Sequence, residues 1–413
     1  MRQRYYGWRL VAALGLITIV AYGTTQYFFG VLVVPVGQEK GWTRAELAAG
    51  YALALAVAGL LGLPLSRWVD RRGARGVIAL GGAIGGASLV GLAGVQTLWQ
   101  WDLIWAAGLG LAGAMTLYPV TFTIVANWFH TRLGTAMAFL TVLGGLASPI
   151  FIPLAGALEG SIGWRRTAFV FGVLQLLVIV PAAAIFVRRH PEDLGLFPDG
   201  ALTAEEAGSH PEQGFAVGDA VRRLPFWTLL VTTLVGLSGG TLLFAHQVAY
   251  MIGRGQAPEV AAALAGGLGL VSLPGRAIFN LLSDRLPSQQ VLAVCQLLQA
   301  LGVAILAFAI SLPALLAYVL VFGAAFGASS PLIASVRAQH FGRRAFARIG
   351  ALQGVAALLG AALAPLVGGL VYDQRHTYVP IFLALAALYV LSAAMMAMTP
   401  RPAVLPSSAP EFI

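Results

Sequence analysis

The sequence predicts an all-α membrane protein with twelve transmembrane helices in two six-helix bundles. Three observations support this prediction. The 413 residues are 59% apolar and only 10% charged, whereas soluble domains are about 45–50% apolar and about 25% charged. Twelve apolar runs each reach the roughly 20 residues that a helix needs to cross a bilayer. One long polar stretch divides these runs into six and six.

Each apolar run is predicted to form a spanning helix, because lipid leaves backbone polar groups no partner outside the segment. In chain order the spans cover residues 9–36, 45–66, 76–97, 102–126, 133–158, 167–187, 225–252, 258–281, 289–311, 313–336, 346–371 and 378–399. The first run follows three arginines but is too long for the apolar region of a signal peptide, so we interpret it as an uncleaved first helix.

The polar stretch from Arg188 to Arg223 is rich in proline and glycine, a composition typical of a surface linker. It predicts a division into an N-terminal bundle (1–187), a cytoplasmic linker (188–224), a C-terminal bundle (225–400) and a cytoplasmic tail (401–413).

The basic residues predict the orientation. If the N-terminus is cytoplasmic, 18 of the 25 basic residues lie in inner segments and six in outer loops, and Arg276 lies within a span. Because basic residues concentrate on the cytoplasmic side, we expect a multi-pass protein of the inner or plasma membrane with both termini cytoplasmic. The six outer residues are Lys40, Arg44, Arg165, Arg166, Arg254 and Arg375.

Several other classes of protein are disfavoured. The net charge of +9 is scattered through short loops, so it predicts membrane topology rather than a nucleic-acid partner. The single cysteine, Cys295, excludes an intrachain disulfide. The six histidines lack metal-ligand spacing, and no pairing of a nucleophile with a base is visible. We therefore expect no metal, no cofactor and no enzymatic activity.

Two Asp-Arg pairs follow the second and eighth spans, as Asp70-Arg71-Arg72-Gly73-Ala74-Arg75 and Asp284-Arg285, and their equivalent places indicate an internal repeat. The first pair with its neighbours resembles the signature loop of the major facilitator superfamily, and the second resembles its weaker echo. Ser66 departs from the glycine that usually opens the signature. The resemblance covers nearly the whole chain and implies the major facilitator fold, with a cytoplasmic gate formed by Asp70, Arg71, Arg75, Asp284 and Arg285.

Six further stretches form an ordered set of motifs: Tyr6-Gly7-Trp8, Phe29-Gly30-Val31, Gly41-Trp42-Thr43-Arg44, Asn127-Trp128-Phe129, Gly163-Trp164-Arg165 and Pro191-Glu192-Asp193-Leu194-Gly195-Leu196. Through their order and spacing rather than singly, they resemble the monocarboxylate and oxalate–formate branch of that superfamily. The resemblance implies a carrier similar to bacterial monocarboxylate transporters. The fifth span lacks the glycine-proline pattern of proton-driven drug exporters.

Arg276 is the most informative residue, because an arginine within a span costs about 2.5–3.5 kcal/mol on insertion scales. The spans contain no central carboxylate to pair with it, and a planar guanidinium suits a carboxylate ligand. The alternative is an arginine that snorkels to the cytoplasmic face. The family resemblance implies that Arg276 anchors the substrate. Ser272, on the same helical face, replaces an aspartate that is tied to proton coupling in animal carriers.

His246 in the seventh span is the candidate for proton coupling, because histidine changes charge near neutral pH. The resemblance supports this role, since bacterial lactate-type carriers have a similar histidine. A neutral imidazole bonded to a neighbouring helix is the alternative.

Further candidate substrate-binding residues lie in the first, fourth and tenth spans. Tyr22 and Gln26 belong to an unusually polar stretch, and animal carriers have lysine in place of Gln26. Tyr118 resembles a substrate-facing tyrosine of the branch. Ser329 and Ser330 interrupt the apolar pattern of the tenth span, and they are predicted either to line the substrate pocket or to mark a kink in the helix. Residues 349–370 contain no lysine or arginine, unlike the corresponding span of oxalate exchangers, so a monovalent anion is favoured.

The predicted function is secondary active transport of a small monocarboxylate, such as lactate or pyruvate, by alternating access from a site between the two bundles. Oxalate–formate-type exchange and drug or amphiphile export are the alternatives, and a non-transporting receptor is a further class. We expect a monomer in the lipid bilayer. A co-transported proton, the direction of flux and the choice between symport and antiport stay open.

Overall fold

The computed structural model describes residues 5–129, 132–200, 214–283, 285–342 and 345–400. These residues form helices and contain no β-strand, and Gly214 and Gly342 make an isolated antiparallel bridge. Twelve helical stretches are long and apolar enough to cross a membrane, which confirms the predicted all-α class and its twelve spans.

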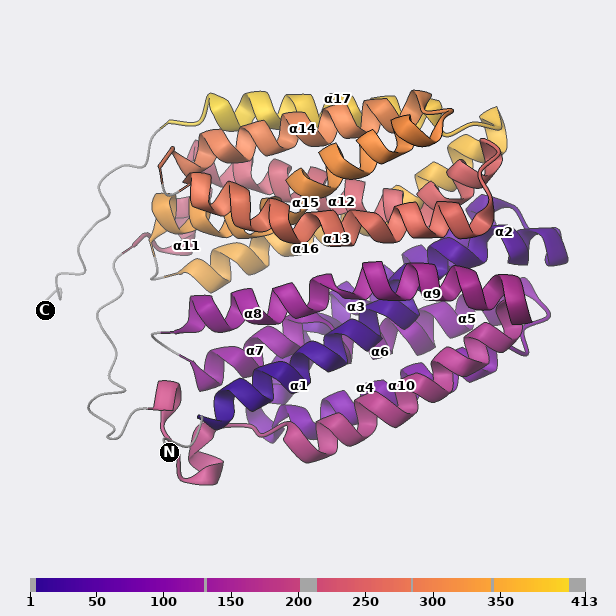
Figure 1. Ribbon diagram of the computed structural model, residues 1–413. Helices are drawn as coiled ribbons and strands as arrows, with labels where there is room; N and C mark the ends of the chain where they lie inside the picture. Colours follow the sequence, from indigo (N-terminus) through magenta and orange to yellow (C-terminus); the bar gives the residue numbers. More distant parts are fainter. Residues whose placement is uncertain (1–4, 130–131, 201–213, 284, 343–344, 401–413) are drawn as a thin grey trace, which may run out of the picture. The chain divides into compact units, whose positions relative to one another are not determined.

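The first six spans are formed by the elements up to α10 (Figure 1). These elements are α1 (Tyr6–Ala21), η1 (Tyr22–Tyr27), α2 (Phe28–Lys40), α3 (Arg44–Arg72), α4 (Ala74–Leu92), α5 (Leu98–Leu103), η2 (Ile104–Gly110), α6 (Leu111–Thr116), α7 (Tyr118–Trp128), α8 (Leu133–Gly145), α9 (Ala147–Ile162) and α10 (Trp164–Phe186).

The remaining elements are two short 3₁₀ turns, one short helix and the last six spans. They are η3 (Pro191–Leu194), η4 (Pro198–Gly200), α11 (Val217–Val221), α12 (Leu224–Gly253), α13 (Pro258–Ser283), α14 (Ser288–Phe308), α15 (Leu312–Phe341), α16 (Phe346–Arg375) and α17 (Val379–Ala397).

Three spans expected as single helices are interrupted. The first and fourth each contain a π-helical turn, η1 and η2. The fourth span also breaks at Leu117, whose backbone is extended (φ −85°, ψ −177°). Pro119 has no N–H to offer the carbonyl of Met115, so one backbone hydrogen bond of a continuous helix is missing here, which favours the break. In the fifth span Leu146 separates α8 from α9, three residues before Pro149.

The chain forms two compact units. Unit 1 comprises Met1–Gly208, Leu243–Gly269 and Pro365–Gln374, and unit 2 comprises Ser209–Leu242, Leu270–Ala364 and Arg375–Ile413. Within unit 1, α4 and α10 pack side by side. A Cβ atom on Gly86 would lie 2.8 Å from the carbonyl oxygen of Gly172, and one on Gly172 would lie 2.7 Å from that of Gly86. Glycine at both positions therefore allows the backbones to approach closely.

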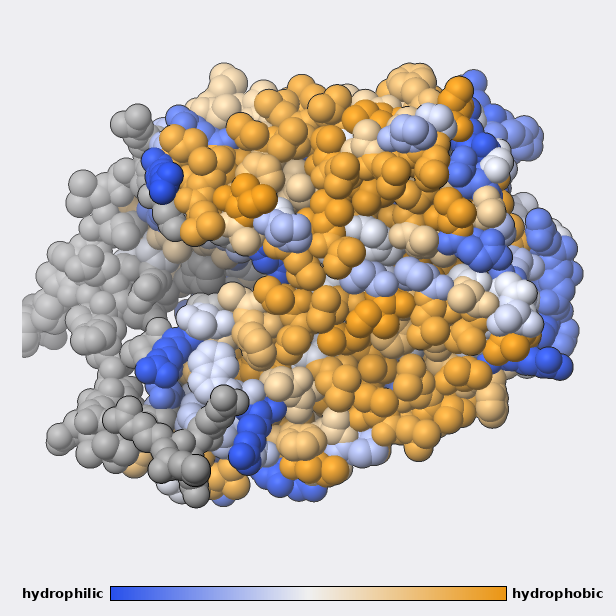
Figure 2. Space-filling view, viewed as in Figure 1, coloured by the Kyte–Doolittle hydropathy of each residue, from blue (hydrophilic) through white to orange (hydrophobic). Residues whose placement is uncertain are grey.

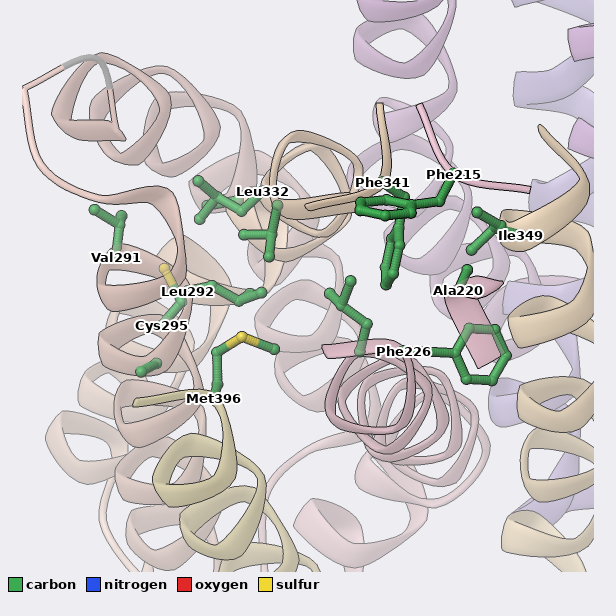
Figure 3. Packing of buried hydrophobic residues seen from close by; sticks show 14 of the residues in the cluster. Phe215, Ala220, Phe226, Val291, Leu292, Cys295, Leu332, Phe341, Ile349 and Met396 are labelled. Atoms are coloured by element: carbon green, nitrogen blue, oxygen red, sulfur yellow. The ribbon is translucent and has the colours of Figure 1, made fainter. Parts of the chain in front are cut away.

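In unit 2, α14 packs between α15 and α17 (Figure 1). One end of these helices is held by a cluster of buried apolar residues, several of which are shown in Figure 3. Phe215 joins the cluster from outside the spans: its N–H donates to the carbonyl of Phe341 (2.9 Å), and the Arg223 guanidinium lies 4.0 Å from its ring centroid. The end of the predicted linker thus packs within unit 2.

The linker's beginning packs in unit 1. The indole N–H of Trp128 donates to the carbonyl of Arg188 (3.3 Å), and the backbone N–H of Arg132 donates to the Asp199 carboxylate (3.0 Å). These bonds give both described ends of the predicted surface linker specific partners.

Large apolar side chains are exposed along the spans. Leu60, Leu177 and Leu281 are 72%, 70% and 67% exposed, and Figure 2 shows apolar residues covering the middle of the helices, with hydrophilic residues at their ends. Apolar surface on this scale is rare on soluble monomers, and it matches the chemistry of lipid tails.

Candidate functional site

The π-helical turn η1 carries two of the predicted site residues, Tyr22 and Gln26. The hydroxyls of Thr24 and Thr25 donate to the carbonyls of Val20 (2.8 Å) and Ala21 (2.6 Å) four residues earlier. Such back-bonding competes with backbone N–H groups for the same carbonyls and favours a local departure from α-helical pairing. Single π-helical turns occur frequently at functional sites.

Gln26 has a partner that sequence analysis missed. The hydroxyl of Tyr51 in α3 donates to Gln26 Oε1 at 2.6 Å. The Tyr51 ring stacks on Phe29, with centroids 4.3 Å apart and planes 8° apart, and meets Trp105 edge-on at 5.6 Å. A tyrosine within an otherwise apolar span was the available signal, because a buried phenol usually needs a hydrogen-bond partner.

Tyr22 and Tyr118 are brought together in unit 1, with ring centroids 5.1 Å apart. Tyr118 is the first residue of α7, directly after the break at Leu117. Its ring also stacks on Phe122 at 4.8 Å. A Cβ atom on Gly144 would overlap the Tyr118 hydroxyl, so the absence of a side chain at Gly144 makes room for the phenol.

His246 is fully buried in α12, and its Nε2 atom lies 2.7 Å from the carbonyl oxygen of Pro365 in α16. Because a carbonyl oxygen only accepts, Nε2 carries the proton in this hydrogen bond. The imidazole therefore links two helices within unit 1.

In unit 2, Arg276 is half-buried, and its Nε donates to the carbonyl of Gly327 in α15 at 3.1 Å. The contact depends on close packing of α13 against α15. A Cβ atom on Gly327 would overlap the carbonyl oxygen of Ser272, and one on Gly275 would overlap the carbonyl oxygen of Ala324. Ser272 is buried, one turn from Arg276 on the same helix.

The two serines of the tenth span differ in environment. Ser329 is buried, donates to the Ala325 carbonyl (3.1 Å) and accepts from Gln299 Nε2 in α14 (2.8 Å). Gln299, which sequence analysis also missed, is fully buried. Ser330 is exposed, and α15 continues through Pro331 without a break.

The residues predicted to form a cytoplasmic gate are described only in part. Asp284 and the side chains of Asp70 and Arg71 lie outside the described residues, and Arg75 and Arg285 are exposed. Gly73, between α3 and α4, has φ +83°. A glycine is suited to this position because other residues rarely adopt positive φ.

Within unit 1, the structure places Tyr22 against Tyr118 and Gln26 against Tyr51. Within unit 2, it places Arg276 and Ser272 at the same contact with Gly327. In the part of the chain that the structure describes, no group of three or more histidine, cysteine or acidic residues is arranged to hold a metal ion.

Twelve apolar spans, one of them carrying a polar π-helical turn at Tyr22–Tyr27, define a polytopic membrane protein. The model of the Major Facilitator Superfamily matches residues 14–288 and 251–412, and the chain belongs to that family.

Similar proteins include an oxalate:formate antiporter from Oxalobacter formigenes, which is 25% identical over 58% of this chain and 54% of its own length. Monocarboxylate transporter 13 from Rattus norvegicus is 23% identical over 96% of this chain and 89% of its own. The solved structure of the nucleoside transporter NupG superposes with a TM-score of 0.74 at 14% identity, covering 95% of this chain and all of the other, and this likeness shows the fold. The chain spans 50–65% of the length of several curated relatives.

Proposed function

We propose that this transporter moves a small organic monocarboxylate, similar to lactate or pyruvate, by alternating access, and that Arg276 holds the carboxylate. The observation that supports the proposal is the half-buried Arg276, oriented by its Nε bond to Gly327 within a membrane span. Two similar proteins carry names of organic-anion carriers.

The energetics favour an anionic cargo. A guanidinium in a membrane span is costly, and a carboxylate lowers this cost through charge-assisted hydrogen bonds. Residues 349–370 of the eleventh span contain no lysine or arginine, so they supply no second cation for a dicarboxylate. This composition favours a monovalent cargo over oxalate-type exchange, which is the second candidate because of the antiporter relative.

Uptake into proteoliposomes tests the proposed function. We expect saturable uptake of labelled lactate or pyruvate, competition by other small monocarboxylates, and little competition by the corresponding neutral amides. A panel in which nucleosides or cationic amphiphiles are transported and carboxylates are not would overturn the proposal.

We further propose that any proton coupling runs through His246. An inward proton gradient should stimulate wild-type uptake, and His246→Gln should flatten the pH dependence, because glutamine can still donate to the Pro365 carbonyl but carries no titratable group. His190→Gln in the linker is the matched control. A steep pH dependence in His246→Gln would assign coupling to another group or to the cargo itself.

We also propose that residues 1–187 and 225–400 act as the two moving bundles, joined by the linker 188–224, with both termini cytoplasmic. The paired loop motifs and the distribution of basic residues support this arrangement. Two stretches of 225–400, Leu243–Gly269 and Pro365–Gln374, belong to compact unit 1. The proposed bundle boundary therefore concerns which residues move together, rather than which residues pack most closely. Thiol labelling of Gln38→Cys, but not of Glu192→Cys, from outside intact cells would agree with this orientation.

A further inference from the structure

The side-chain amide of Gln26 has one acceptor, its oxygen, and one donor group, its nitrogen, and of these two only the oxygen has a hydrogen-bond partner among the described residues. Its oxygen accepts the Tyr51 hydroxyl at 2.6 Å. Its amide nitrogen, which carries two donor hydrogens, makes no hydrogen bond to any of the described residues. Gln26 is only half-buried, and it lies on the π-helical turn in the middle of a span. An amide N–H group in this position within a membrane span indicates a ligand that carries a hydrogen-bond acceptor.

Tyr51 holds the amide in one orientation. Its side chain is 2% exposed and is packed between Phe29 and Trp105, so its hydroxyl has little freedom to move. When that hydroxyl donates to Gln26 Oε1, the amide nitrogen points away from Tyr51. Donation to the oxygen also polarises the amide and strengthens its N–H groups as donors.

The turn that carries Gln26 is held from a second side. The Thr24 hydroxyl lies 2.8 Å from Gln175 Oε1 in α10, and both residues are fully buried. A Cβ atom on Gly85 would overlap the Gln175 amide, so glycine at that position leaves room for the glutamine. The backbone of η1 is thus supported by α10, and the side chain of Gln26 by α3.

We propose that Tyr51 is a positioning residue that presents the Gln26 amide nitrogen as a neutral hydrogen-bond donor to the carboxylate of the cargo. This inference rests on the proposed function, and it adds specificity to it. A neutral donor recognises the geometry of a carboxylate without adding a positive charge. The pair would therefore favour a carboxylate over the corresponding amide.

Binding to purified protein, measured by calorimetry with lactate and pyruvate, tests the inference. Gln26→Leu removes the donor and should weaken binding about tenfold. Gln26→Glu is the sharper variant, because its carboxylate still accepts the Tyr51 hydroxyl but turns an oxygen toward the anion. Gln26→Glu should therefore bind more weakly than Gln26→Leu. Equal or tighter binding by Gln26→Glu would show that Gln26 does not donate to the cargo.

Tyr51→Phe keeps the aromatic packing and removes the hydroxyl, so it should weaken binding about threefold to tenfold and lower the melting temperature only slightly, by the loss of one hydrogen bond. The same substitution in a Gln26→Leu background should have no further effect, since Tyr51 acts through Gln26. An equal loss in both backgrounds would overturn the positioning role. Wild-type protein that binds no carboxylate would instead refute the proposed function.

Discussion

Arg276→Ala is expected to reduce carboxylate affinity by about tenfold or more, because a charge-assisted hydrogen bond contributes about 1.5–3 kcal/mol. The loss should appear in equilibrium binding, measured by tryptophan fluorescence or calorimetry, as well as in transport. Binding is the decisive measurement, since a transport rate combines affinity with the rate of conformational change.

Arg276→Lys separates charge from geometry. The native Nε–H group donates to the Gly327 carbonyl (3.1 Å). The planar guanidinium has further N–H groups in fixed directions on its two terminal nitrogens. A lysine ammonium has no second, fixed set of donors, so its affinity should fall between wild type and alanine. Arg254→Ala is the matched control, because the Arg254 guanidinium contacts Tyr250 near the end of α12. Equal affinity of wild type and Arg276→Ala for every transported carboxylate would exclude the anchor role.

Gly327→Ala is expected to destabilise the protein by about 1–3 kcal/mol, the usual cost of overpacking, and to weaken carboxylate binding as well. A methyl group at Gly327 would collide with the backbone of Ser272. Backbone atoms within a helix cannot move aside as a side-chain tip can, so α13 and α15 must separate. Their separation would shift the carbonyl that orients Arg276. Thermal unfolding in detergent measures the first effect and ligand binding the second.

Gly354→Ala is the matched control in α16, because a Cβ atom there would meet no other atom within 4 Å. Alanine is the better helix former, so this variant should be as stable as wild type or slightly more stable. If Gly327→Ala behaved like Gly354→Ala, the close contact between α13 and α15 would not contribute to stability or to the position of Arg276.

The helical class and the twelve spans were predictable from the sequence because they follow from local composition. A run of about 20 apolar residues must satisfy its own backbone in lipid and therefore forms a helix. The family was likewise predictable from short motifs, such as the loop that ends in Gly73, where a positive φ favours glycine. Arg276 was conspicuous for a similar reason, since a charge in an apolar run is costly wherever the chain folds.

The interruptions within spans were harder to predict. Tyr22–Tyr27 was recognisable as polar, but its π-helical form depends on the threonine hydroxyls and on the fit of Gly23 against Phe151 in α9. Tyr118 was recognisable beside Pro119, but the position of the break, at Leu117, came only from the structure. Such details depend on the neighbouring helices, which hydropathy patterns do not identify.

The sequence by itself determined the class of protein, the number of spans and the polar or charged residues that cost free energy to place in a membrane. Only the tertiary structure decided which groups those residues meet. Tyr51 and Gln26 are 25 residues apart, Ser329 and Gln299 are 30 apart, and Arg276 and Gly327 are 51 apart. The local composition of a segment determines whether the segment is stable in lipid, and this can be read from the sequence. These hydrogen bonds depend instead on side-chain direction and on how closely two helices approach, which are properties of the packed fold.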